Sequence, residues 1–165
     1  MIIILKMKKT AIHFLQFVVL LFGLFSLILL LRFPLLEGRA VNLTLFEIYS
    51  DPFILYVYLS SIAFYLALLE LVKLLKYIGE DRLFSITSIA AIKKIKFCSF
   101  FICIFIVLGA IYIRFFHHPE DDPAGFMALS ILLILIFTAV GTATAVFEKI
   151  IQKAVNMKQE NDLTI

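Results

Sequence analysis

Four long stretches without a charged side chain dominate the pattern of hydrophobic and polar positions along this chain. They are 22, 18, 17 and 25 residues long. Because an α-helix rises about 1.5 Å per residue, helices of this length, extended by flanking residues, cross a hydrocarbon core about 30 Å thick. The third stretch is the shortest, but the side chains of Lys96 and Arg114 at its ends can reach the polar interface. The pattern predicts membrane spans at about residues 10–32, 52–75, 97–114 and 124–147.

Proline and glycine mark the boundaries of the second span. Pro52 suits the first turn of a helix, and we expect this helix to continue to Tyr77 and to end at Gly79. The preceding loop, residues 33–51, contains a proline, a glycine and charges of both signs. Within it, we expect a short interfacial segment at Leu43–Ile48.

The segment between the second and third spans allows two interpretations. Ser85 or Thr87 can cap a helix that runs through the lysines at positions 93, 94 and 96 into the third span. Isoleucines also recur at every third position from Ile86 to Ile95, which leaves open a separate amphipathic helix on the membrane surface.

The composition supports a membrane protein. The chain is 63% hydrophobic and 16% charged, whereas soluble domains are about 45–50% apolar and about 25% charged. Basic residues before the first span also fit a signal peptide, but the apolar region is too long for one and no small-residue cleavage site follows it. We expect a retained span, with Met1 and Met7 both open as the start. Residues 1–165 are expected to form a single membrane domain.

The distribution of basic residues predicts the orientation. With four spans, twelve of the fifteen Lys and Arg residues lie on the side that holds both termini, and three lie on the other side. Because cytoplasmic loops are enriched in Lys and Arg, we expect both termini, the loop at 76–96 and the tail at 148–165 to be cytoplasmic. The predicted fold class is all-α, an integral membrane four-helix bundle.

The sequence contains little that indicates chemistry. It lacks the GxSxG, HExxH and phosphate-loop patterns, and we expect no enzyme, no cofactor, no metal site and no direct binding of nucleic acid. Cys98 and Cys103 share one apolar stretch and are expected to be small core residues. In the fourth span, Thr138, Gly141, Thr142 and Ala145 share one face, which favours close packing either within the bundle or in a homo-oligomer.

Two groups of polar residues are candidates for interaction. Near the end of the second span, Glu70 is expected to pair with Lys73 at the interface rather than to act as a functional carboxylate buried in the membrane. The loop that follows is expected to meet a soluble partner, through the cations Arg82, Lys93, Lys94 and Lys96.

The second group lies in the loop between the third and fourth spans. It could bind a metal, sense pH or capture a cationic peptide, although a solvated acidic loop that helps to set the orientation is the simpler interpretation. Its members are His117, His118, Glu120, Asp121 and Asp122.

Three stretches resemble a family of small bacterial four-span membrane proteins, the domain-of-unknown-function 2975 family. They are LLKYIGEDRLFSITSIAAIKKIKFC (74–98), EDDPAG (120–125) and IIQKAVNMKQENDLTI (150–165). The resemblance implies a multi-pass protein of the bacterial plasma (inner) membrane, in contact with the lipid bilayer. It also implies a gene placed beside that of a small helix-turn-helix regulator, and it supplies no activity.

Two hypotheses of function follow. The first is a non-enzymatic regulatory membrane protein that modulates a cytoplasmic helix-turn-helix regulator through the loop and the tail. The alternative is a resistance or immunity protein that meets membrane-active peptides at its acidic outer loop. A small transporter subunit is a third interpretation, disfavoured because ionisable groups within the uncharged stretches are confined to His13.

Overall fold

The computed structural model describes residues 2–36, 44–116 and 122–163, and this part of the chain forms five helices. Four are long and apolar enough to cross a membrane, whereas the second has only five residues. The predicted all-α membrane bundle is therefore confirmed. The helices are α1 (Ile2–Leu36), α2 (Leu45–Tyr49), α3 (Pro52–Gly79), α4 (Ile86–Phe116) and α5 (Ala124–Leu163).

Helix α3 begins and ends where the sequence predicts. A carboxylate oxygen of Asp51 accepts hydrogen bonds from the backbone N–H groups of Phe53 (2.8 Å) and Ile54 (3.3 Å), so Asp51 caps the helix just before Pro52. The helix ends at Gly79. Asp81 then adopts a left-handed backbone conformation with φ of 56°, which turns the chain toward α4.

One uninterrupted helix joins the basic segment to the third span. Ser85 caps α4, because its hydroxyl accepts a hydrogen bond from the backbone N–H of Ser88 at 3.3 Å. Helix α4 then runs from Ile86 through the three lysines to Phe116. The expected continuous helix is confirmed, and the alternative of a separate surface helix is not found.

The short helix α2 fits the interfacial segment expected in the first loop. Thr44 and Glu47 form a reciprocal capping box, in which Glu47 accepts hydrogen bonds from the backbone N–H and the hydroxyl of Thr44, each at 2.8 Å. These two bonds lower the pKa of the Glu47 carboxyl. Ile48 is buried, whereas Leu45 and Phe46 are exposed, as in a helix that lies on a membrane surface.

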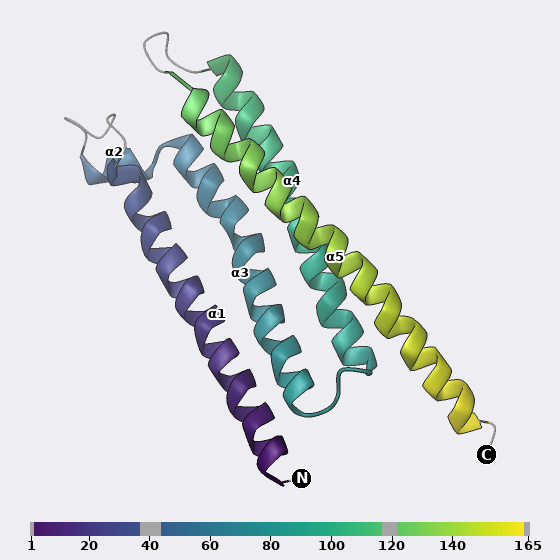
Figure 1. The fold of residues 1–165 in the computed structure, drawn as a ribbon. Coiled ribbons are helices and arrows are strands. Elements are labelled where there is room, and N and C mark those ends of the chain that lie inside the picture. Colours follow the sequence, from purple (N-terminus) through teal and green to yellow (C-terminus); the bar gives the residue numbers. More distant parts are fainter. Residues whose placement is uncertain (1, 37–43, 117–121, 164–165) are drawn as a thin grey trace.

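The four long helices run up and down, and each packs against the next one in the chain, α1 on α3, α3 on α4 and α4 on α5 (Figure 1). The start of α1, the turn between α3 and α4 and the end of α5 lie at the same end of the molecule (Figure 1). We call this the basic end, because it holds Lys9, the basic segment at residues 73–96 and the lysines of α5.

A glycine allows α5 to pack closely against α4. Gly141 is buried, and a Cβ atom at this position would lie only 3.1 Å from the Phe100 ring. Gly141 belongs to the face of small residues that was predicted in the fourth span. It therefore packs against the Phe100 ring of the same chain. Its neighbours Thr138 and Thr142 remain exposed, and the Thr142 hydroxyl donates to the Thr138 carbonyl at 2.7 Å.

The long helices exceed what a bilayer requires. Helices α4 and α5 have 31 and 40 residues, which correspond to about 46 Å and about 60 Å of helix. The hydrocarbon core measures only about 30 Å. Both helices are therefore longer than a perpendicular crossing requires, and the lysines of both helices lie toward the basic end.

Candidate functional site

The ends of three helices at the basic end share a hydrophobic core. Helices α3, α4 and α5 meet there, and Ile92 and Ile151 at its centre are 0% and 2% exposed. All but one of its members lie outside the predicted spans. We call this cluster the basal core; it consists of Leu74, Ala91, Ile92, Ile95, Ile151 and Val155.

A core of this kind differs from the usual packing of helices within lipid. Within lipid, apolar side chains gain nothing by leaving the solvent, and helices pack mainly through small residues and hydrogen bonds. At the basic end, branched aliphatic side chains are buried while Lys93, Lys94 and Lys153 on the same helices are exposed. We call this unit, residues 70–96 together with 148–160, the platform.

Glu70 links α3 to α4 at the upper edge of the platform. Its carboxylate oxygen Oε1 lies 2.8 Å from Nζ of Lys73 and 3.2 Å from Nζ of Lys94. The Glu70 side chain is 12% exposed, whereas both lysines are more than half exposed. The predicted pair with Lys73 is confirmed. Its pairing with Lys94, 24 positions away, could not be found from the sequence because it depends on how the two helices face each other.

A second ion pair links α4 to α5. Nζ of Lys96 lies 2.6 Å from Oε2 of Glu148, and the two side chains are only 21% and 19% exposed. The sequence marked Lys96 as an interaction residue, but the structure engages its ammonium within the chain. Glu148 was not predicted to have a role.

The other two predicted cations of the loop lie at the surface. Arg82 is 3.4 Å from Glu80 and stacks over the Tyr77 ring, with 5.7 Å between its guanidinium carbon and the ring centroid. Lys93 is exposed, as are the apolar side chains of Phe84 and Ile86. The tip of the platform thus presents cations beside apolar groups, the mixture found at many protein interfaces.

At the opposite end, Asp122 has a structural role. Its carboxylate accepts a hydrogen bond from the backbone N–H of Ala124 at 2.9 Å and so caps the start of α5. The other four candidates of this loop, His117, His118, Glu120 and Asp121, lie outside the described residues. Among the residues that are described, no group of three or more His, Cys, Asp and Glu side chains is placed to hold a metal ion.

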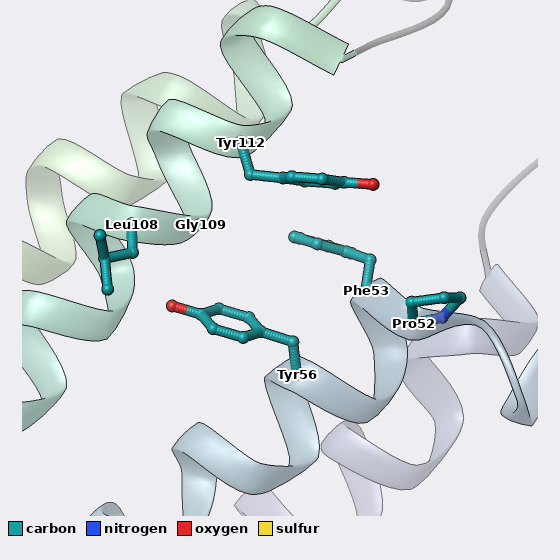
Figure 2. A pocket seen from close by; sticks show the side chains of 6 residues that line it. All are labelled: Pro52, Phe53, Tyr56, Leu108, Gly109 and Tyr112. Atoms are coloured by element: carbon teal, nitrogen blue, oxygen red, sulfur yellow. The ribbon is translucent and has the colours of Figure 1, made fainter.

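An aromatic pocket that the sequence did not predict lies between α3 and α4 near this opposite end (Figure 2). It encloses about 210 Å³, and the rings of Phe53 and Tyr112 stack across it with centroids 6.1 Å apart. The Tyr56 hydroxyl donates to the Phe105 carbonyl at 2.7 Å. Gly109 leaves room for the Tyr56 ring, because a Cβ atom there would lie 3.4 Å from it. The lining is almost entirely apolar apart from the hydroxyls of Tyr56 and Tyr112.

Comparison with known proteins supports the resemblance. The model of a family described as a protein of unknown function, DUF2975, matches residues 35–165. An uncharacterized membrane protein, YoaS of Bacillus subtilis (strain 168), is 34% identical over 111 residues, which cover 67% of this chain and 69% of the relative. No solved structure matches.

Proposed function

Because this chain belongs to the DUF2975 family of proteins of unknown function, we propose a role from its own geometry, that of a non-enzymatic regulatory protein that holds a soluble partner at the membrane. The four long helices anchor it in the bilayer. The platform supplies the binding surface. The observation that carries the proposal is the basal core, because a folded unit beyond the spans is not needed for anchoring alone.

The distribution of basic residues supports a platform on the cytoplasmic side. Twelve of the fifteen Lys and Arg residues fall on the side of the basic end, which is the bias of cytoplasmic segments. In a bacterium, the protein then lies in the plasma membrane with both termini inside the cell. A partner must therefore come from the cytoplasm.

The surface of the platform favours a protein partner over nucleic acid. Residues 70–96 carry six cations and three carboxylates, and Glu70 and Glu80 each pair with cations of the same segment. Nucleic-acid binding relies on many unpaired cations along one surface. Here Phe84 and Ile86 are exposed close to Arg82 in the sequence, and Lys93 is exposed about two turns further along α4, which suits a protein with an apolar patch edged by acidic residues. We propose a helix-turn-helix regulator as this partner, as the family resemblance implies.

Affinity purification of the tagged full-length protein from native membranes tests this proposal. We expect mass spectrometry to find a helix-turn-helix protein clearly enriched over an unrelated four-span control. The double variant Phe84→Ser, Lys93→Glu should lose it, because both side chains are exposed on the platform and neither belongs to the basal core. Phe116→Ser, Arg114→Glu, which makes the same kinds of change at exposed positions of α4 outside the platform, is the matched control. Equal recovery with the tip variant and the control, or no such protein at all, would contradict the proposal.

A further inference from the structure

A polar cavity lies between α1 and α3 at the basic end, apart from the basal core. It measures about 310 Å³, and its charged and polar lining residues are Lys9, His13, Gln16, Lys76 and Glu80. Helix α1 contributes three of these side chains and α3 contributes Lys76. Glu80 follows directly after α3 ends.

Two close contacts fix the walls of this cavity. The Gln16 side-chain amide donates to the Val72 carbonyl at 3.1 Å. One turn nearer the start of α1, Ile12 packs against Gly79, where a Cβ atom would lie 3.5 Å from the Ile12 methyl carbons. These contacts hold the two helices together, and the cavity is a depression between them that is open to solvent along the exposed Lys9 and Lys76.

The charge in the cavity is suited to an anion. Lys9 and Lys76 bring two ammonium groups from different helices. The single carboxylate, that of Glu80, forms ion pairs with Arg82 at 3.4 Å and with Lys76 at 3.9 Å, so cations outnumber carboxylates around the cavity. His13 donates from Nδ1 to the Lys9 carbonyl at 2.7 Å, which leaves Nε2 as the ring nitrogen for a ligand.

The position of the cavity along the first span favours a lipid as the source of the anion. Lys9 directly precedes the first uncharged stretch, so the cavity lies at the level where the apolar span meets water. Lipid phosphates occupy this level, and basic pockets between helices there bind acidic headgroups. Directly beyond the cavity, Phe14 and Phe17 of α1 are exposed and can contact acyl chains.

We propose that this cavity binds the phosphate of an anionic phospholipid, with Lys9 and Lys76 as the counter-ions. The bound headgroup joins α1 to α3 at the end of their contact. Lys76 and Glu80 also belong to the platform, but the cavity includes neither Phe84 nor Lys93, the platform residues that the partner experiment changes.

Native mass spectrometry of the full-length protein in detergent tests the assignment, with dioleoylphosphatidylglycerol and dioleoylphosphatidylcholine as probes. We expect phosphatidylglycerol to be bound preferentially. The double variant Lys9→Gln, Lys76→Gln should bind it about thirtyfold more weakly, because each lysine near the lipid surface contributes about 1 kcal/mol. The matched control is Lys149→Gln, Lys153→Gln, which removes two exposed lysines of α5 outside the cavity. It should stay within about twofold of the wild type. Circular dichroism checks that both variants keep their helices.

Two results would overturn the proposal. Equal phosphatidylglycerol binding by the cavity variant and the α5 control would show that the cavity is not the lipid site. Inorganic phosphate or glycerol 3-phosphate that displaces the lipid at equal concentration would assign the cavity to a soluble anion instead.

Discussion

Replacing Ile92 with alanine is expected to lower the free energy of unfolding by about 2–5 kcal/mol, the usual cost of truncating a fully buried aliphatic side chain. Ile92 is 0% exposed and contributes to the basal core formed by α3, α4 and α5. Alanine keeps the helix, so the loss comes from packing and from the cavity left behind. Thermal unfolding of the purified protein in mild detergent, followed by near-ultraviolet circular dichroism of its tyrosines, measures the effect.

Ile86→Ala is the matched control. It removes the same atoms from the same helix, but Ile86 is 70% exposed, so a change within about 0.5 kcal/mol is expected. If the two variants unfold at the same temperature, the basal core does not contribute to stability. The platform would then be a set of independent helix ends.

The second large effect is expected at the pair between Lys96 and Glu148. Glu148→Ala leaves the Lys96 ammonium, which is only 21% exposed, without the carboxylate now 2.6 Å away. Losing one partner of a fully buried pair costs about 3–5 kcal/mol. Because both side chains retain some access to solvent, we expect about 1–3 kcal/mol here. The same thermal unfolding measurement applies.

A double-mutant cycle separates this pair from general effects of the substitutions. With Lys96→Met present, Glu148→Ala should cost at least about 1 kcal/mol less than it does alone, because the Lys96 ammonium that would lose its partner is no longer present. Lys93→Met, on the exposed side of the same helix, should leave the cost of Glu148→Ala unchanged. Additive losses for Lys96→Met and Glu148→Ala would contradict the pairing.

The bounds of α3 and the start of α4 could be predicted from the sequence because they depend on local chemistry, whereas α1 continues through Pro34 to Leu36, where a loop was expected. Pro52 and Gly79 bound α3 as expected, and the hydroxyl of Ser85 starts α4. Each of these signals acts within a few residues of its own position. The uncharged stretches likewise predict spans by length alone.

The packing at the basic end could not be predicted, because it depends on how each helix is rotated about its axis. Isoleucines spaced by three drift around a helix with 3.6 residues per turn, so their pattern does not say which of them are buried. The structure buries Ile92 and Ile95 and exposes Ile86. The same ambiguity concealed the pairing of Glu70 with Lys94.

The aromatic pocket was missed for a different reason. Eighteen phenylalanines and six tyrosines are spread over the chain, so an aromatic residue carries little positional information. What distinguishes the pocket is Gly109, which makes room for the ring of Tyr56 on a neighbouring helix. A single glycine within a span gives no sign from the sequence of which side chain it will meet.

Cysteine labelling tests whether the platform emerges from the membrane into the cytoplasm. In a chain with Cys98 and Cys103 replaced by serine, Lys93→Cys reports on the platform, and Ile104→Cys reports on the lipid-facing part of the same helix. A membrane-impermeant maleimide should leave position 93 unlabelled in intact cells and label it after permeabilisation, while position 104 stays unlabelled in both. Labelling of position 93 in intact cells would place the platform outside the cell, and no labelling after permeabilisation would place it within the bilayer.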